Sequence, residues 1–197
     1  MIPLVQRRAV AMPASDAILA ARIADGDRAA LAFVYTRDAG KVYRFALAMC
    51  GNAAWAADAT QDAFVQLAAQ AQAFDAARGA LGAWLAGVVR HRLYAQWREA
   101  RDTPALPDDD ADDVDGRHEI TPELLLVRRQ QQDALWAAVR TLAWPFREAL
   151  VLVDLQDRSY AEAAAIAGIE INTLRTRLHR ARRRLAQALN AQPGEHA

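Results

Sequence analysis

Cysteine and lysine are the scarcest residues in this sequence. Among 197 residues there is one cysteine, Cys50, and one lysine, Lys41. A single cysteine excludes an intramolecular disulfide and a cysteine-based zinc site, and it favours a reducing compartment. Because Cys50 lies in the apolar segment 45–50, we expect it to be a small, buried core residue.

Signals for membrane insertion or export are also lacking. No run of about 18 apolar residues is available to span a bilayer. The first residues contain no apolar stretch followed by a small-residue cleavage site. We therefore expect a cytoplasmic protein without membrane insertion.

Residue patterns typical of enzymes are missing. The histidines are scattered along the sequence, at His91, His118, His179 and His196. No His-Glu-x-x-His pair, phosphate-loop glycine pattern or Ser-His-Asp arrangement occurs. The sequence therefore predicts that the protein is not an enzyme and has no catalytic residue, metal site, cofactor or small-molecule substrate.

Glycine and proline are few, at 9 and 7 residues, whereas 53% of the residues are apolar. Alanine and arginine, both good helix formers, are abundant. Hairpin-type turn sequences are almost absent apart from Asp25-Gly26, and no alternating pattern is long enough for a sheet. The sequence predicts an all-α fold with a real hydrophobic core.

The formal net charge is zero, which by itself argues against a nucleic-acid binder, because such proteins usually carry a basic excess. The charges are unevenly distributed, however. Residues 1–102 carry 12 basic and 9 acidic side chains, residues 103–122 carry 1 and 7, and residues 123–197 carry 11 and 8. The total is therefore the sum of +3, −6 and +3, with two basic ends and an acidic middle.

The acidic middle has the composition of a solvated, extended linker. It combines prolines with a run of aspartates and has almost no apolar periodicity. We therefore expect two small helical domains joined by an acidic flexible linker. The predicted parts are a tail (1–15), a first domain (16–102), the linker (103–122), a second domain (123–190) and a tail (191–197).

A helix-turn-helix is predicted in the second domain. Ser159 can cap a short helix over 160–167, and Gly168 can supply the turn. A second helix then opens at Asn172 or Thr173 and continues to about residue 189. Its predicted buried stripe consists of Leu174, Leu178, Ala181, Leu185 and Leu189.

Two further helices are expected before this motif. The apolar periodicity predicts them over 123–142 and 146–155, with a break at Trp144-Pro145.

The polar face of the last helix is strongly basic. It carries six arginines and no acidic residue between positions 172 and 186, so the like charges have no partners one turn away. A solvated surface helix is the alternative, but DNA contact explains the pattern better. The side chains placed to reach base edges are Asn172, Thr173, Arg175, Thr176, Arg177, His179 and Arg180, and those placed to touch the DNA backbone are Arg182, Arg183 and Arg184.

The first domain contains a second basic helix, over 84–101. Its predicted core stripe consists of Leu85, Val88, Val89, Leu93 and Trp97. Its opposite face is predicted to be an exposed basic-aromatic stripe of Arg90, Tyr94, Arg98 and Arg101. Arginines interleaved with an aromatic ring suit single-stranded or melted DNA. A core tryptophan with solvated arginines is the alternative.

An acidic and polar surface is predicted on an earlier helix of the first domain. Asp58, Gln61 and Asp62 can share one face there, while Phe64 and Leu67 pack elsewhere. From the residues alone, a solvated acidic face explains this pattern.

Several motifs resemble the sigma-70 family of bacterial RNA polymerase sigma factors, specifically the short extracytoplasmic-function (ECF) group. The most specific is Thr173-Leu-Arg-Thr-Arg-Leu-His-Arg-Ala-Arg182, which is similar to the end of the family's fourth region. In the first domain, 57–64 resembles the family's Glu-Asp-x-x-Gln-Glu/Asp-x-Phe helix and 83–93 its Trp-Leu helix. Two unrelated motif sets in the right order make coincidence a poor explanation.

The resemblance implies a function in promoter-specific transcription initiation. It implies that the second domain binds the promoter's minus-35 element and that Asp58, Gln61 and Asp62 bind core RNA polymerase. It also implies an anti-sigma factor as a partner, and a linker that threads the polymerase's RNA-exit path. The residues it assigns to the minus-ten element are Gln72, Asp75, Arg78, Arg90, His91, Tyr94, Arg98 and Arg101.

The sequence departs from the family pattern in places. Ala57, Ala143 and Ala163 replace the usual Glu, Pro and Ile, and His91 stands where Asn is common, which leaves the base preference at minus-ten open. The alternative function is an ordinary helix-turn-helix regulator with a helical sensor or dimerisation domain. The acidic linker is either a plain tether or a decoy that weakens DNA binding by the free protein.

Overall fold

The computed structural model describes residues 15–102 and 134–190. Within these two ranges the elements are all helical, so the predicted all-α class is confirmed, and no strand occurs in them. The predicted linker 103–122 lies outside the described residues, and so do residues 1–14, residues 191–197 and the first part of the helix predicted from residue 123. The exact domain boundaries therefore stay predictions.

The N-terminal part is a bundle whose helix ends are set by polar side chains and a glycine. Asp27 Oδ1 accepts a hydrogen bond from the Ala29 backbone N at 2.8 Å, and Asn52 Oδ1 accepts one from Trp55 N at 2.9 Å. Gly51, at φ +71°, ends the long second helix. The elements are α1 (Asp16–Ala24), α2 (Arg28–Cys50), α3 (Ala53–Gln70), the 3-10 turns η1 (Ala71–Ala73) and η2 (Ala76–Arg78), and α4 (Leu81–Asp102).

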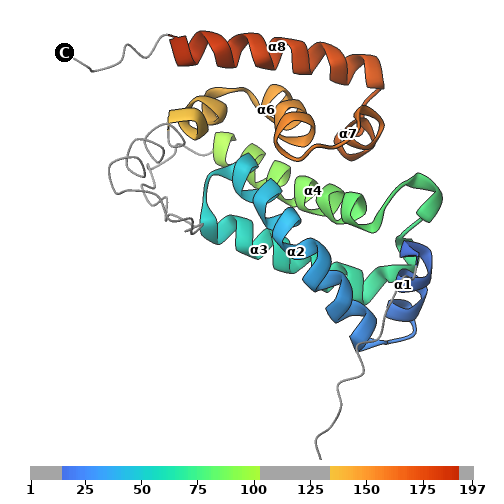
Figure 1. Ribbon diagram of the computed structural model, residues 1–197. Helices are drawn as coiled ribbons and strands as arrows, with labels where there is room; N and C mark the ends of the chain where they lie inside the picture. Colours follow the sequence, from blue (N-terminus) through green and yellow to red (C-terminus); the bar gives the residue numbers. More distant parts are fainter. Residues whose placement is uncertain (1–14, 103–133, 191–197) are drawn as a thin grey trace, which may run out of the picture.

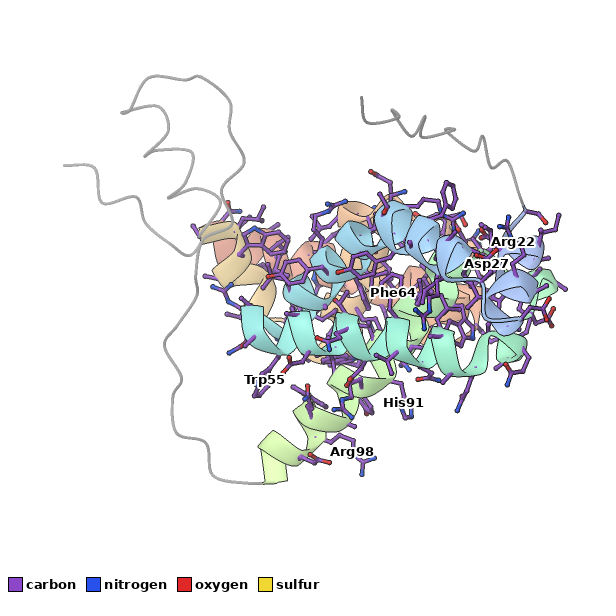
Figure 2. The ribbon with its side chains drawn as sticks, turned by 90° about the horizontal axis from the view of Figure 1, so that it is seen from below. Arg22, Asp27, Trp55, Phe64, His91 and Arg98 are labelled. Atoms are coloured by element: carbon purple, nitrogen blue, oxygen red, sulfur yellow. The ribbon has the colours of Figure 1, made fainter. Side chains whose placement is uncertain are left out.

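The core of this bundle comes mainly from its three long helices, and α1 adds Leu19 and Ile23. Phe45 and Met49 of α2, Leu67 of α3, and Leu85 and Leu93 of α4 are all buried. Burying each of these side chains stabilises the fold by about 1.5–3 kcal/mol. Figure 2 shows Phe64 inside the bundle, whereas the Arg22–Asp27 pair lies at the α1–α2 turn, where Arg22 Nε donates to Asp27 Oδ2 at 2.8 Å.

The C-terminal part is built from several short helices followed by one long helix. Residues 134–141 are helical. The sequence prediction placed Trp144-Pro145 in a break, but α6 begins at Trp144, because proline is tolerated in a first turn where its missing N–H loses no partner. The following elements are α6 (Trp144–Leu150), the π-helical turn η3 (Val151–Leu155), α7 (Tyr160–Ala167) and α8 (Ile171–Asn190).

The two parts pack against each other. Figure 1 shows α6, α7 and α8 as a layer over α4 and α2, and the buried residues form one continuous core from α1 to α8. Gln156 Nε2 donates to the carbonyl O of Lys41 at 2.9 Å, and Arg147 Nη1 donates to the carbonyl O of Met49. The sequence, read as two domains on a tether, does not predict this packing.

Cys50 lies at the edge of that packing. It is half-buried rather than fully buried as expected, and its Sγ donates to the carbonyl O of Asn52 at 3.3 Å. Burial raises the pKa of the Cys50 thiol, and the nearby Arg147 opposes that shift.

Candidate nucleic-acid interface

The predicted helix-turn-helix is present as α7, its turn and α8. Ser159 and Glu162 form a reciprocal capping box: Ser159 Oγ accepts from Glu162 N at 3.2 Å, and Glu162 Oε2 accepts from Ser159 N at 3.1 Å. The Ser159 hydroxyl also donates to Glu162 Oε2 at 2.8 Å, and this hydrogen bond, together with the one from Ser159 N, lowers the pKa of Glu162. Gly168, at φ +65°, ends α7 in the left-handed conformation that a glycine adopts without strain. α7 therefore ends at this glycine, and α8 begins three residues later at Ile171.

The apolar stripe of α8 holds the helix on its own domain. Leu174, Leu178 and Ala181 are buried, as predicted, while Leu185 is half-buried and Leu189 is exposed at the C-terminal end. α8 packs on both α6 and α7. This fixes which face of α8 is presented to solvent.

The opposite face of α8 presents polar side chains along its length. Arg177 is the exception to the predicted exposure, because it is half-buried. Asn172 Oδ1 accepts from Arg175 Nη1 at 3.4 Å, so these two side chains are already in contact at the helix start. The exposed members of the predicted sets are Asn172, Thr173, Arg175, Thr176, His179, Arg180, Arg182, Arg183 and Arg184.

The arginines of α8 differ in their surroundings. Arg182 makes two hydrogen bonds to Asp154, at 2.9 and 2.6 Å, and this carboxylate raises the pKa of Arg182. The Arg184 guanidinium lies 4.2 Å from the centre of the Phe146 ring. Among the described residues, Arg180 and Arg183 have no ion-pair partner. The local charge of +6 counted from the sequence is therefore partly neutralised by an aspartate on another element.

The predicted basic-aromatic stripe of α4 is exposed only in part. Arg98 and His91 are exposed, and Figure 2 shows both projecting from α4. Arg90 and Tyr94 are half-buried, which corrects the predicted exposure, because the C-terminal domain covers the face of α4 that carries them. Arg101 lies in α4, but its side chain is outside the described residues.

A buried carboxylate explains the position of Arg90. Arg90 Nε donates to Oε1 of Glu148 on α6, and the Glu148 side chain is 1% exposed. Burial raises the pKa of Glu148, while Arg90 and, less strongly, Arg177 act in the opposite direction. One carboxylate thus interacts with an arginine from each of the two predicted DNA-binding helices.

Three predicted minus-ten residues meet at one cavity. Gln72 lies in η1, Asp75 caps η2 by accepting from Ala77 N at 2.9 Å, and Arg78 ends η2. Asp75, Arg78 and His91 line a cavity of about 370 Å³ between the η turns and α4, whereas Gln72 does not. Its remaining walls include Phe74, Trp84 and, from α7, Ala165 and Ile166.

The predicted acidic surface of α3 is exposed. Asp58, Gln61 and Asp62 all face solvent, and Asp62 Oδ2 lies 3.0 Å from Arg92 Nη2 of α4. Two exposed apolar side chains on the same helix, Trp55 and Val65, were not predicted as part of this surface. Figure 2 shows Trp55 projecting from α3.

Sequence reasoning missed Glu148, although a signal was present. Glu148 is four residues from Trp144 and from Leu152, both of which are buried. This spacing places a charged residue on an apolar helix face, where a charge needs a partner. The identity of that partner, 58 positions earlier in the chain, is not readable from helical periodicity.

In residues 15–102 and 134–190, no group of three or more potential metal-ligating side chains was found. No helix in these ranges is long and apolar enough to cross a membrane.

The fold and site define a two-domain, all-helical protein with a helix-turn-helix whose second helix is basic. Residues 34–103 match the model of sigma-70 region 2, and residues 132–185 match that of sigma-70 region 4. The chain belongs to the ECF group of sigma-70 family RNA polymerase sigma factors, and sigma factors are generally not enzymes. The alternative of an ordinary helix-turn-helix regulator is not favoured.

Curated relatives support this family membership along most of the chain. The ECF RNA polymerase sigma factor SigE of Mycolicibacterium smegmatis is 31% identical over 88% of this chain and 68% of its own length. SigM of Mycobacterium tuberculosis is 32% identical over 89% of this chain and 85% of its own length.

Two solved structures share the fold. Sigma factor RpoE of Bartonella quintana, solved in complex with the anti-sigma factor NepR, matches with a TM-score of 0.64 and 24% identity over 81% of this chain and 96% of RpoE. CnrH, solved with the cytosolic domain of CnrY, matches with a TM-score of 0.68 and 24% identity over 90% of this chain and 99% of CnrH.

Proposed function

We propose that this sigma factor recruits core RNA polymerase to promoters by binding two DNA elements with its two domains. The observation that carries the proposal is the exposed polar face of α8, which a capped and glycine-terminated α7 holds in the geometry of a recognition helix. This face supports binding of the minus-35 element in the major groove. Asn172 to Arg180 would reach base edges, and Arg182 to Arg184 would contact phosphates.

The N-terminal domain would bind the minus-ten element as a melted strand. The exposed Arg98 and His91 on α4 support contact with phosphates and bases. The cavity lined by Asp75, Arg78 and His91 is large enough for an unstacked base, and its wall includes the aromatic rings of Phe74 and Trp84. Gln72, Arg90, Tyr94 and Arg101 belong to the same proposed surface.

Core polymerase would dock on α3. Its exposed face combines the carboxylates of Asp58 and Asp62 with the apolar side chains of Trp55 and Val65. A surface that mixes an aromatic anchor with charges at its edge is typical of protein–protein interfaces. We include Trp55 in the proposed docking surface for this reason. Because this function requires polymerase, we also expect the protein in the cytoplasm.

A protein antagonist is a further expected partner. RpoE and CnrH, which share this fold, were each solved with a protein partner, and for RpoE that partner is an anti-sigma factor. We propose that this chain is likewise held by an anti-sigma factor.

In vitro transcription with core polymerase over a random promoter library tests this function. We expect the complete chain to select two conserved DNA elements and to start transcription downstream of them. The Trp55→Ala variant should lose transcription through weaker polymerase binding, and the control Val65→Ala should lose less because it removes a smaller contact. A chain that binds a palindromic site but never starts transcription with polymerase would contradict the proposal.

A further inference from the structure

The first turn of α4 has no capping residue of its own. The helix follows Gly79 and Ala80, whose side chains cannot accept a hydrogen bond, and its first turn contains no acidic residue. The Ala80 carbonyl O accepts from Ala83 N at 3.0 Å and from Trp84 N at 3.1 Å. The earliest backbone N–H groups of the helix therefore need acceptors from another part of the chain.

The missing cap is supplied by α1. Asp16 Oδ2 accepts a hydrogen bond from Leu81 N at 2.6 Å, although the two residues are 65 positions apart. Asp16 is the first residue of α1, and Leu81 is the first residue of α4. A carboxylate at a helix N-terminus is also stabilised by the helix dipole. One side chain thus fixes where α4 begins relative to α1.

A second carboxylate lies at the same end of α4. Asp38 of α2 is buried, and a Cβ atom at Gly82 would lie 3.5 Å from its Oδ1. Arg37 joins the two carboxylates, because its Nη1 donates to Asp16 Oδ1 at 2.7 Å and its Nη2 donates to Asp38 Oδ2 at 2.7 Å. The hydrogen bonds to Asp38 and Asp16 raise the pKa of Arg37 against the effect of burial. The bridge keeps Asp16 in the orientation that accepts from Leu81.

α1 also contacts the other end of the segment that joins α3 to α4. It packs on η1, and Figure 1 shows it beside this connection. Most of the cavity proposed for the unstacked base is lined by this connection and by the first two turns of α4. The chain passes from one wall to the other at Gly79, whose φ of +140° only glycine readily adopts. α1 therefore holds the cavity walls on both sides of this glycine.

We infer that Asp16, held by Arg37, is a positioning residue for minus-ten recognition, because it fixes the start of α4 against the connection that forms the opposite cavity wall. Asp16 does not line the cavity, so it acts through the backbone of Leu81. Without the cap the first turn of α4 frays, and Trp84 no longer keeps one position relative to Arg78. This inference rests on the proposed function, because it concerns the base-binding cavity assigned there.

Three variants of α1 test the inference. Asp16→Ala removes the acceptor, whereas Asp16→Asn keeps an oxygen that can accept from Leu81 N and loses only the charge. Asp25→Ala is the matched control, because it removes an exposed aspartate from the other end of the same helix. Each full-length protein is assembled with core polymerase. The probes are the single-stranded minus-ten element selected in the promoter library, its single-base variants and the selected minus-35 duplex.

We expect Asp16→Ala to bind the selected minus-ten strand about fivefold more weakly than the native protein, because fewer molecules hold the cavity in its binding shape. The variant should also discriminate less between bases at one position of the strand. Asp16→Asn should recover most of the affinity, and Asp25→Ala should match the native protein. All four proteins should bind the minus-35 duplex equally well, which a general loss of stability would not allow.

Hydrogen exchange provides a measurement that needs no DNA. In the free chain, Asp16→Ala should speed exchange of the backbone amides in the first turn of α4, because Leu81 N loses its acceptor. The amides of α8 should exchange as in the native protein. Asp25→Ala should leave both helices unchanged, and circular dichroism should show native helix content for each variant.

Arg37→Lys guards against misfolding of Asp16→Ala. Lysine keeps a positive charge beside the buried Asp38, but it lacks the planar fork that reaches Asp16 at the same time. We expect a smaller loss of affinity for the minus-ten strand, in the same direction, and no loss for the minus-35 duplex.

The outcomes separate the inference from the function on which it rests. The inference is wrong if folded Asp16→Ala binds the minus-ten strand with native affinity and base preference, or if it weakens both DNA elements equally. If Asp16→Ala does not fold, native minus-ten binding by Arg37→Lys overturns the inference. In these cases the native protein still selects promoters with polymerase, so the proposed function stands. If the native protein selects no minus-ten element, the proposed function fails, and hydrogen exchange still decides whether Asp16 caps α4.

Discussion

Arg180 and Arg183 differ from the other α8 arginines in what their guanidinium groups contact. Both are exposed, and neither has an ion-pair partner among the described residues. Arg182, by contrast, is already bound to Asp154. An arginine that must break an ion pair with a carboxylate before it binds a DNA phosphate gains less binding free energy. The contribution of each arginine to DNA affinity should therefore depend on whether it already has a partner in the protein.

Arg180→Ala is expected to cost about 1–3 kcal/mol of binding free energy for the minus-35 duplex and to relax preference at one base position. The reason is that Arg180 lies within the reach of base edges in the proposed pose. Binding of the holoenzyme to a library of single-base variants measures both effects. Arg182→Ala is the control and should cost less. A uniform loss over all sequences would make Arg180 a phosphate contact instead.

Arg183→Ala is expected to weaken binding by a similar factor for every duplex sequence. It lies further along α8, where phosphates rather than bases are in reach. The slope of log K against log salt should become shallower by about 1. Titrations at several salt concentrations, with Arg182→Ala as comparison, check this; an unchanged slope would remove Arg183 from the phosphate contacts.

At the scale of elements, the orientation of α8 depends on how α7 begins and ends. Ser159→Ala removes the side-chain acceptor for Glu162 N and is expected to cost about 1 kcal/mol of unfolding free energy. Thermal unfolding of the full chain should show a melting temperature lower by about 2–4 °C. Ser159→Asp keeps an acceptor and should retain most of the stability, whereas an equal loss in both variants would argue against the cap.

Glu162 makes the stability of the same motif depend on pH. Hydrogen bonds from Ser159 hold the pKa of Glu162 below its ordinary value of about 4.3. The resulting stabilisation is complete above that ordinary value and is lost as the pH falls through the lowered pKa. Between about pH 5 and 3, the native chain should therefore lose more unfolding free energy than Glu162→Gln. Denaturant titrations measure the unfolding free energy of the two proteins at each pH. If the two values fall in parallel as the pH is lowered, Glu162 is not the origin of this pH dependence.

The helices of the DNA-binding motif could be predicted well because their signals are local. Ser159 and Gly168 lie within one turn of the ends they fix, and the spacing of Leu174, Leu178 and Ala181 identifies the buried face of α8. The start of α6 was predicted less well, since a proline marks a break in a helix interior but is compatible with a first turn. Local signals thus predict elements better than they predict the environment of each side chain.

At the scale of the whole molecule, the contacts between the two domains could not be predicted. They join residues far apart in the sequence, such as Arg90 and Glu148, 58 positions apart, and Lys41 and Gln156, 115 positions apart. Charge counting therefore treated Arg90 as free, and periodicity placed Tyr94 on an exposed face. Charge counting by segment is limited in the same way, because acidic residues remote in sequence pair with Arg90 and Arg182 in the folded chain.

Cys50 can report on this domain packing, because the neighbouring residues contact the C-terminal domain: Arg147 bonds the Met49 carbonyl, and Arg140 lies against Gly51. Burial raises the pKa of the Cys50 thiol, and the thiolate is the form that reacts. Separation of the two domains should therefore speed the reaction of Cys50. In Ellman's assay we expect Glu148→Gln, which removes the charge that pairs with Arg90 across the two domains, to react several-fold faster than the native chain. The control Asp157→Asn, at an exposed position of the same domain, should react like the native chain. Equal rates for all three would show that opening does not expose Cys50.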